Sequence, residues 1–536
     1  MSSESESQTD KSKKYDRQLR LWGERGQAAL ETASVCLINA TAAGTETLKN
    51  LVLPGIGSFA IVDGEKVTKA SIGNNFFLHD DWLGKSRAEC ATALLLELNG
   101  DVKGNYVDET AERMLQNRPE FFKSFSCVIA TNLSEKTLLN LGDILWGYQI
   151  PLVVVRAYGM IGYIRLVFAE HPVVESHPES AHPDLRLDRP FPEFVQYVDS
   201  LDLTSMTKQE HGHTPFLVLL LKYLNRYKES HDGNLPKTYK EKGVLKELIK
   251  TGILLNENGD PEDEENFDEA VKNVNSCLVP TRVPEEVESV FADPACCNLT
   301  HQSSTFWILA RAVKDFVANE GEGALPLRGS IPDMTADSKR YIKLQQIYQA
   351  KAMEHATCVK ERVYRLLDEM GKPRDSIADE DVKLFCKNAH FLRVIRCRSL
   401  GEEYARETAK SQDIDMHLGD EDSDLVFYVV LRAADRFQSQ ENRYPGETVE
   451  DVDSDKRMLK ETTASFVKEM GINSAIKTEC IDEMCRYGGC ELHAVAAFLG
   501  GVAAQEVIKI VTHQFVPFNN TFVYNAIRGT SLTIEL

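Results

Sequence analysis

Three features are absent from this 536-residue sequence: paired cysteines, long apolar runs and an excess of basic charge. The twelve cysteines never form a C-x-x-C pair, so we expect neither a zinc ribbon nor a disulfide scaffold. The longest apolar run, Phe216–Leu221, falls far short of the roughly 18 residues that a transmembrane helix needs. These absences predict a soluble chain in a reducing, intracellular compartment, with no transmembrane segment.

The charge balance excludes general binding to nucleic acid. Lys and Arg number 61 against 82 Asp and Glu, a formal net charge of −21. Nucleic-acid binding needs clustered cations that displace counterions from phosphates. An acidic surface favours basic protein partners, although acidity also serves solubility alone. Because the polar N-terminus has no apolar signal core, we expect a cytoplasmic location, with the nucleus as the alternative.

Alternating strand and helix patterns over residues 15–170 predict a parallel α/β sheet. Apolar strands are expected at 34–38, 58–63, 126–130, 151–155 and 160–168. Residues 171–192 hold five prolines and three histidines, which marks an exit from that domain. From 214 to 473 the pattern is mainly helical, and the apolar α/β style returns near the C-terminus.

We therefore expect four parts. They are a disordered tail (1–14), the first part of an α/β fold (15–170), a mainly helical insertion (171–488) and a closing part (489–536). In the closing part, Gly500-Gly501 lies inside an apolar helix and predicts close packing against another backbone. The predicted fold class is α/β: one Rossmann-like sheet, built from both chain ends around a large insertion.

The segment 34–46 has the layout of a nucleotide-binding turn without its glycines. A strand leads into a small-residue turn and a helix, an arrangement in which glycine lets the backbone approach phosphates. The three glycine positions of a dinucleotide fingerprint are here Asn39, Thr41 and Gly44. Because two of the three carry side chains, we expect a retained fold and a lost phosphate site.

Two segments at opposite ends of the chain resemble the ubiquitin-activating-enzyme family. YDRQLRLWG at 15–23 resembles the opening of its adenylation domain, and GGVAAQEVIKIVTHQFVPFNNTFVYN at 500–525 resembles its close. The insertion carrying GSIPDMTADSKRYIKLQQIY at 329–348 is most similar to regulatory subunits of the neddylation-pathway activating enzyme. The SUMO-pathway counterpart, a shorter chain, is the alternative. The resemblance implies a Rossmann-like adenylation fold and a heterodimer with a catalytic subunit.

The family's working fold binds ATP and Mg²⁺ through residues that this chain has mostly lost. Of that set, only Asp63, the acid after the second strand, is retained. The arginine position holds Asn75, the lysine position holds Arg87 with Lys85 nearby, and the metal-binding aspartate is Asn132. Mg²⁺ requires hard anionic oxygen ligands. The resemblance therefore implies that this chain binds no cofactor and that ATP and Mg²⁺ belong to the partner subunit.

The family's thioester nucleophile is also missing. No cysteine stands in the P-x-C-T-like context of that nucleophile, so we expect all twelve to be structural. The resemblance implies a division of labour. The complex adenylates the C-terminal glycine of the pathway's ubiquitin-like modifier and passes it to a cysteine of the partner, while this chain completes the dimer.

Arg17 matches the family arginine that reaches the partner's ATP site. A guanidinium supplied in trans would hold triphosphate oxygens while pyrophosphate departs. Arg20 is a second candidate, three residues further on. A surface salt bridge at a helix start is the alternative for both.

The resemblance also implies two segments that face the catalytic partner, His211–His213 and Asp333–Gln346. The expected contact residues are His211, His213, Asp333, Met334, Tyr341 and Ile342. Ordinary helix starts within the chain are the alternative. The H-x-H pattern has no further ligand nearby in the sequence, so no metal site is expected.

Two functions of other classes remain open. A nicotinamide-dependent oxidoreductase needs a glycine-rich turn and an acid about 20 residues after it. Asp63 fits that spacing, whereas Asn39 and Thr41 do not fit the turn. A pure scaffold would use the α/β fold for docking only, and no single arginine would then affect turnover.

Overall fold

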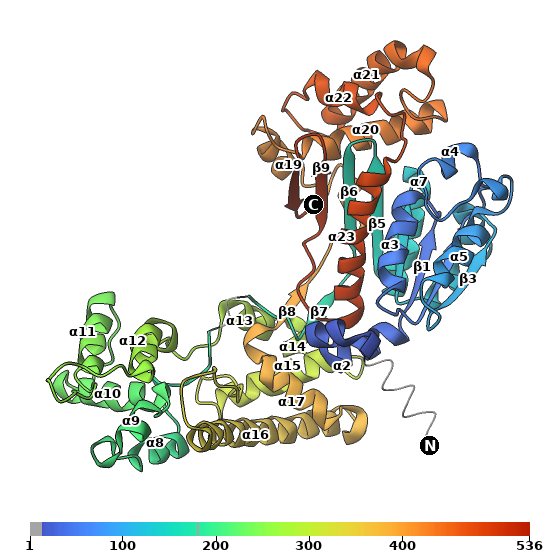
Figure 1. Ribbon diagram of the computed structural model, residues 1–536. Coiled ribbons are helices and arrows are strands. Elements are labelled where there is room, and N and C mark those ends of the chain that lie inside the picture. The colour runs from blue at the N-terminus through green and yellow to red at the C-terminus, as the bar shows by residue number, and fades with distance from the viewer. Residues whose placement is uncertain (1–12, 180–181) are drawn as a thin grey trace. The chain divides into compact units, whose positions relative to one another are not determined.

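The computed structural model describes residues 13–179 and 182–536 (Figure 1). All but two residues of the expected N-terminal tail lie outside the described residues. The chain divides into two compact units. We call Met1–Val173 with Val394–Leu536 the α/β unit, and Val174–Arg393 the helical unit.

The α/β unit is built on one mixed eight-stranded sheet in the order β10-β9-β6-β5-β4-β1-β2-β3. Strands β3, β2, β1, β4 and β5 are parallel, and β6, β9 and β10 complete the sheet in antiparallel pairs. Both chain ends therefore share one sheet, and the predicted α/β class is confirmed. The strands are β1 (Ser34–Ile38), β2 (Ser58–Val62), β3 (Lys103–Val107), β4 (Cys127–Thr131), β5 (Leu152–Tyr158), β6 (Ile161–Val167), β9 (Thr521–Asn525) and β10 (Thr530–Ile534).

Both faces of the sheet are covered because its central strands, β2, β1, β4, β5 and β6, are buried on both sides. Val35 and Leu37 point to one core, and Cys36 and Ile38 point to the other, as the two-residue period of a strand requires. The first core is covered by α2 (Asp16–Thr32), α3 (Ala42–Val52), α5 (Arg87–Glu97) and α23 (His493–Thr512). The second is covered mainly by α6 (Ala111–Asn117), α7 (Glu135–Tyr148), α20 (Val426–Glu441), α21 (Val452–Met470) and α22 (Thr478–Met484).

The structure divides the chain differently from the single insertion expected at 171–488. Residues 394–488, with α18 (Leu400–Tyr404) and α19 (Ser411–Leu418), belong to the α/β unit. Helix α20 is buried nearly all round, so it needs a partner on every side. Two ion pairs reinforce this packing: Arg165 of β6 lies 2.6 Å from Glu403, and Arg156 of β5 lies 2.6 Å from Asp435.

The helical unit has an apolar core of its own, centred on the buried face of α10. Its predicted helical character is confirmed, and α10 begins at Phe216 with Pro215 as its N-cap. Its α-helices are α8 (Pro192–Asp199), α9 (Lys208–Gly212), α10 (Phe216–Ser230), α11 (Tyr239–Lys250), α12 (Glu265–Cys277), α13 (Glu285–Ala292), α14 (Pro294–Cys297), α15 (Thr305–Ala318), α16 (Ser338–Glu369) and α17 (Asp379–Asn388).

Helix α23 is the one helix among the described residues that is long and apolar enough to cross a membrane. More than half of its apolar window, 56%, is buried inside the protein, as in the core helix of a globular fold. Its glycine pair accounts for part of that packing. A Cβ at Gly500 would lie 2.7 Å from Glu46 Cβ on α3, whereas a Cβ at Gly501 would meet nothing within 4 Å. The predicted close approach of backbones is therefore confirmed for Gly500.

Replacing Gly500 with alanine should separate α23 from α3 and destabilise the α/β unit by about 1–3 kcal/mol, the usual cost of overpacking. The matched control is Gly501→Ala, which adds the same methyl group one residue away in open space. The control should be neutral or stabilising by up to ~1 kcal/mol, because alanine favours helix. Urea unfolding of the full chain, followed by circular dichroism, measures both. Equal effects of the two substitutions would contradict this packing.

Candidate functional site

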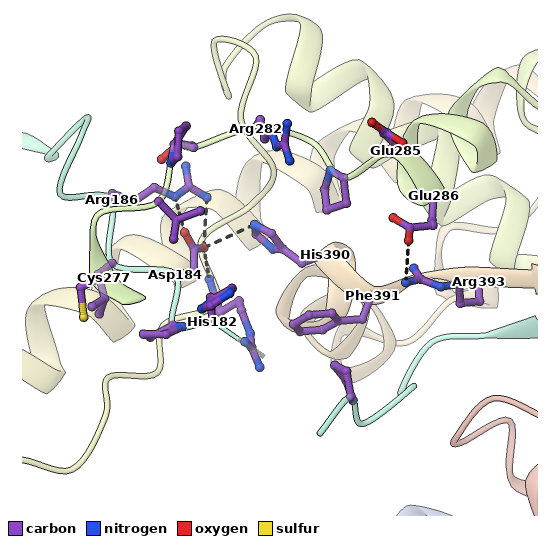
Figure 2. Close-up of a pocket in the computed structure, with 18 residues that line it drawn as sticks. His182, Asp184, Arg186, Cys277, Arg282, Glu285, Glu286, His390, Phe391 and Arg393 are labelled. Atoms are coloured by element: carbon purple, nitrogen blue, oxygen red, sulfur yellow. Dashed lines mark hydrogen bonds and ion pairs between the residues drawn. The ribbon is translucent and has the colours of Figure 1, made fainter. Parts of the chain in front are cut away.

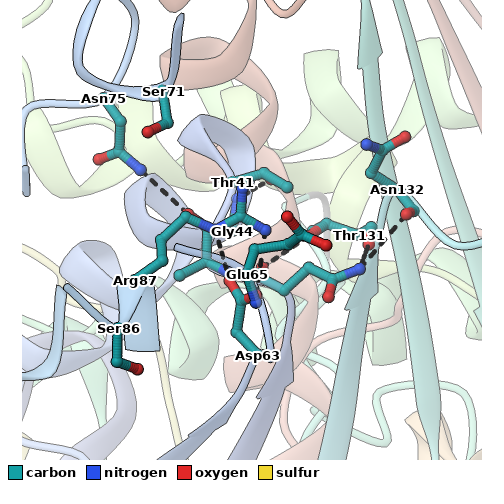
Figure 3. A network of polar contacts seen from close by, with 12 residues as sticks. Thr41, Gly44, Asp63, Glu65, Ser71, Asn75, Ser86, Arg87, Thr131 and Asn132 are labelled. Carbon is teal, nitrogen blue, oxygen red and sulfur yellow. Dashed lines mark hydrogen bonds and ion pairs between the residues drawn. The ribbon is translucent and has the colours of Figure 1, made fainter. Parts of the chain in front are cut away.

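The candidate site lies at the carboxyl ends of β1, β2 and β4, where parallel α/β sheets bind nucleotides (Figure 3). Asn39, just after β1, has a left-handed φ of 66°, and its Nδ2 donates to the carbonyl of Thr131 at 2.9 Å. Thr41 is the N-cap of α3 and accepts from the Gly44 N–H. A Cβ at Gly44 would lie 2.9 Å from the Asn39 carbonyl oxygen, so close packing of the turn itself requires this glycine.

Asp63 follows β2 and has no exposed side-chain surface. Its Oδ2 accepts from Arg87 Nε at 2.5 Å and from the Ala40 N–H at 2.8 Å. Its Oδ1 accepts from Arg87 Nη2 at 3.1 Å and from the Glu65 N–H at 2.9 Å. The carboxylate is therefore fully engaged by its own chain, and no oxygen of it remains for a ribose or a metal ion.

The two asparagines at positions where the family resemblance implies an arginine and an aspartate are held by hydrogen bonds within the protein. Asn75 accepts from the Thr45 hydroxyl at 3.1 Å and donates to the Ala40 carbonyl at 3.1 Å. Asn132, after β4, accepts from the Tyr444 hydroxyl at 3.1 Å. Tyr444 belongs to the 394–488 segment, so that segment reaches the edge of the degenerate site. Both amides therefore connect separate segments of the α/β unit by hydrogen bonds.

Glu491 is a residue of this site that the sequence did not reveal. The Ala43 N–H, in the first turn of α3, donates to Glu491 Oε2 at 3.3 Å. Burial raises the pKa of this carboxyl, against the opposing effect of the Thr41, Ala42 and Ala43 donors. The N-terminus of a helix attracts anions, and in a nucleotide-binding fold this one would receive a phosphate. A carboxylate from 448 residues further along the chain takes that place, and no local pattern predicts it.

The cysteines have the character of packing residues. Eight of the twelve are buried, Cys358 and Cys480 are partly buried, and only Cys297 and Cys490 are exposed. Burial raises the pKa of Cys127 and of Cys386 to about 12, which keeps both thiols protonated and unreactive at neutral pH. Within residues 13–179 and 182–536, no three His, Cys, Asp or Glu side chains come together in a group that could hold a metal ion.

The two candidate arginines of α2 differ in their surroundings. Arg20 is 78% exposed and forms an ion pair with Asp16 at 3.0 Å. For Arg20 the structure therefore favours the alternative, a surface salt bridge. Arg17 is exposed and makes no hydrogen bond or ion pair with any residue that the structure describes. Its guanidinium is accordingly available to another molecule.

The structure brings together the two segments expected to face a partner. The Asp337 N–H donates to the His213 carbonyl at 3.1 Å, and Arg340 Nη1 donates to the Glu210 carbonyl at 2.8 Å. At this surface Asp333, His213 and Ile342 are exposed, Ile342 to 49%. Tyr341 is half-buried, and so is Met334, which packs on the core of the helical unit.

His211 corrects the predicted set of partner contacts. Its side chain is buried, its Nδ1 lies 2.6 Å from Glu264 Oε1, and its ring stacks on Phe267. A charged partner and an aromatic face hold it inside the helical unit, so it cannot touch another subunit. The H-x-H pattern also fails to converge, because His213 bonds to the Gln209 carbonyl instead.

Substituting Arg87 with alanine should leave the Asp63 carboxylate buried without its cation. Breaking a buried ion pair on one side costs about 3–5 kcal/mol. The matched control is Arg118→Ala, which breaks the exposed pair with Glu109 in the same unit and should cost less than ~1 kcal/mol. Urea unfolding of each variant measures the difference. Equal losses of unfolding free energy in the two variants would show that the burial of the Asp63 carboxylate does not depend on Arg87.

Three comparisons place the chain among known proteins. The ThiF family model matches residues 15–535. The NEDD8-activating enzyme E1 regulatory subunit of Xenopus laevis is 55% identical over 98% of this chain and 99% of its own. The protein of the same description from Gallus gallus is 53% identical, and that from Drosophila melanogaster is 46% identical, each over 98% of both chains.

A solved structure of E. coli tRNA N6-threonylcarbamoyladenosine dehydratase with AMP also matches, at a much lower level. It is 21% identical, has a TM-score of 0.26, and covers 28% of this chain and 64% of its own. That similarity is too low to bear on the site.

Proposed function

The chain belongs to the ThiF family and, within it, to the NEDD8-activating enzyme E1 regulatory subunits, and we propose that it is the non-catalytic half of a heterodimer. In this proposal the complex adenylates the C-terminal glycine of NEDD8, a ubiquitin-like modifier, and passes it to a cysteine of the catalytic subunit. The relatives' names favour the neddylation pathway over the SUMO pathway. The composition supports a location in the cytoplasm, with the nucleus as the alternative.

The observation that carries the non-catalytic role is that the chain's own charges fill its nucleotide site. Glu491 accepts a hydrogen bond from the N-terminus of α3, and Arg87 is paired with the carboxylate of Asp63. A triphosphate would have to displace a tethered carboxylate and would be repelled by it. With an amide in place of the metal-binding aspartate, at Asn132, Mg²⁺ also lacks its anionic ligand. We therefore assign ATP and Mg²⁺ to the partner subunit.

The same filled site argues against the oxidoreductase alternative. A dinucleotide needs a turn free of side chains and an unpaired acid for the ribose. Here Asn39 and Thr41 fill the turn, and the carboxylate of Asp63 is bound on both oxygens. A nicotinamide cofactor would meet the same obstacles as ATP.

The contribution of this chain to the chemistry, in our proposal, is Arg17. Its guanidinium is exposed and unpaired among the described residues, whereas Arg20 nearby is held by Asp16. Leu21, four residues after Arg17 and so on the same helix face, is 53% exposed. An exposed leucine beside a free arginine suits an interface that seats the helix and directs the cation into a partner's site. The planar guanidinium would then hold phosphate oxygens as charge develops.

The helical unit offers a second surface for the partner. It consists of His213, which follows α9, Asp333, in the segment before α16, and Tyr341 and Ile342 near the start of α16. The hydrogen bonds between these two segments fix their positions relative to each other before any partner binds. His211 supports this surface from below through Glu264 and does not belong to it.

Purified alone, the chain should bind Mg–ATP with a Kd weaker than ~1 mM and form no acyl adenylate with the modifier. The reconstituted heterodimer is the control and should do both. Isothermal titration calorimetry measures the affinity, and trapping of modifier–AMP measures the product. Tight binding of Mg–ATP by the isolated chain, or adenylation without the partner, would refute the non-catalytic role.

The Arg17→Ala substitution should leave the heterodimer intact and slow its ATP–pyrophosphate exchange by roughly 10²–10³-fold, because a cation supplied in trans is lost at the transition state. Arg20→Ala is the matched control, removing the same charge from the same helix. It should exchange at close to the wild-type rate. Size-exclusion chromatography checks assembly. A normal exchange rate in the Arg17→Ala complex would favour a pure scaffold.

A further inference from the structure

The helical unit has a cavity, open to solvent and of about 570 Å³, that the proposed function does not use (Figure 2). This volume is within the range of pockets that hold small organic ligands. The lining comes from several segments that lie far apart in the sequence. They include Asp184–Arg186, the stretch Val279–Glu286, Arg328 and the turn that carries His390, Phe391 and Arg393.

The charge of this lining is opposite to that of the whole chain. Four arginines face three carboxylates in the cavity, while the chain as a whole has a formal net charge of −21. Two of the carboxylates are already paired. Arg186 Nε donates to Asp184 at 2.6 Å, and Arg393 lies 3.5 Å from Glu286. Burial opposes ionisation of Asp184, but the Arg186 hydrogen bonds outweigh it and lower the pKa of Asp184.

Two donors of the lining lack partners. Arg328 Nε is buried without a hydrogen bond, and its guanidinium lies over the Phe391 ring at 4.6 Å. Desolvation by burial lowers the pKa of Arg328, against the opposing effect of the Asp184 charge. His390 Nδ1 is also buried without a partner, and burial lowers the pKa of His390 to about 4. At neutral pH the ring is therefore uncharged. Its Nε2 lies 3.9 Å from Asp184 Oδ2, beyond hydrogen-bond distance, and the tautomer protonated on Nδ1 donates one N–H to the cavity. Buried donors left unpaired cost about 1–3 kcal/mol each, so their position calls for an explanation.

The third donor, Arg282, lies at the exposed edge of the lining. Arg282 is exposed and makes no hydrogen bond or ion pair with the residues that the structure describes. The segment that carries it is held in place nevertheless, since Thr281 donates to Asp188 through its N–H at 2.6 Å and its hydroxyl at 2.7 Å. A fixed backbone with a free guanidinium gives a donor that needs little reorganisation to bind an anion.

We propose that this cavity binds the phosphate group of a small organic phosphate ester, held by Arg282, Arg328 and His390. These donors come from three separate segments, and a tetrahedral phosphate offers three terminal oxygens in different directions. A carboxylate has only two oxygens in one plane and would suit a single arginine fork better. A metal ion is disfavoured because the arginines already neutralise Asp184 and Glu286.

The rest of the cavity suits the organic part of such an ester. The volume exceeds what inorganic phosphate alone would fill, and Pro280, Pro284 and Phe391 supply apolar wall. Arg328 stacked on Phe391 presents a flat face as well as a charge. This site is independent of the proposed adenylation role, because all of its residues lie in the helical unit.

The test uses the full chain and isothermal titration calorimetry with ribose 5-phosphate, glucose 6-phosphate, inorganic phosphate and ribose. We expect at least one of the two esters to bind with a Kd below ~1 mM. Ribose, which lacks the phosphate, should bind at least tenfold more weakly than ribose 5-phosphate. No measurable binding of either ester or of phosphate would overturn the proposal.

Variants assign any binding to this cavity. Arg282→Gln and Arg328→Gln should each weaken binding of the ester about tenfold, roughly one charge-assisted hydrogen bond. The matched control is Arg374→Gln, an exposed arginine of the same unit outside the cavity, which should leave the affinity unchanged. Arg282 is exposed, so its loss does not threaten folding. Unchanged affinity in Arg282→Gln would place the ester elsewhere, including the degenerate site of the α/β unit, and would overturn the proposal.

Discussion

The buried ion pair between Asp63 and Arg87 is the contact on which the character of the α/β unit depends. An acid at the end of β2 is the residue through which this kind of sheet would engage a nucleotide, and here it is neutralised within the fold. Because Asp63 also accepts from the backbone after β1, the pair fixes the turn that leads into α3. The same geometry then presents the N-terminus of α3 to Glu491. In our proposal, loss of nucleotide binding and retention of the fold are thus two results of one set of contacts.

The local part of this site could be read from the sequence, since spacing along a strand–turn–helix unit is short-range information. Asn39, Thr41 and Asp63 lie where the turn pattern placed them, at the ends of β1 and β2. The position of Gly500 within an apolar helix likewise predicted a close approach to another backbone, which is that of α3. In each case a local structural requirement restricts which residue type can stand at one or two positions, and the sequence shows that restriction.

The rest depended on contacts between distant parts of the chain. Glu491 and Tyr444 reach the site from more than 300 residues away, and nothing in their own neighbourhoods distinguishes them from other acids and tyrosines. The prediction that residues 394–488 belong to the helical insertion was wrong for the same reason. A helical pattern does not indicate which hydrophobic core the helix packs against. Strand β3 was missed because it lies at the sheet edge with mostly exposed side chains and no apolar run. His211 was predicted to be a surface residue, but Glu264 and Phe267, which enclose it, lie more than 50 residues further along the chain.

The sheet order has a consequence for biosynthesis. Strand β9 lies next to β6, and α23 packs on α3, so one wall of the first core is supplied by residues after 492. A ribosome makes the opening strands long before that wall exists, and until then the apolar sides of α3 and β5 have no cover. Nearly five hundred residues must emerge before the unit can close, which favours late, post-translational folding and a need for protection by chaperones during synthesis.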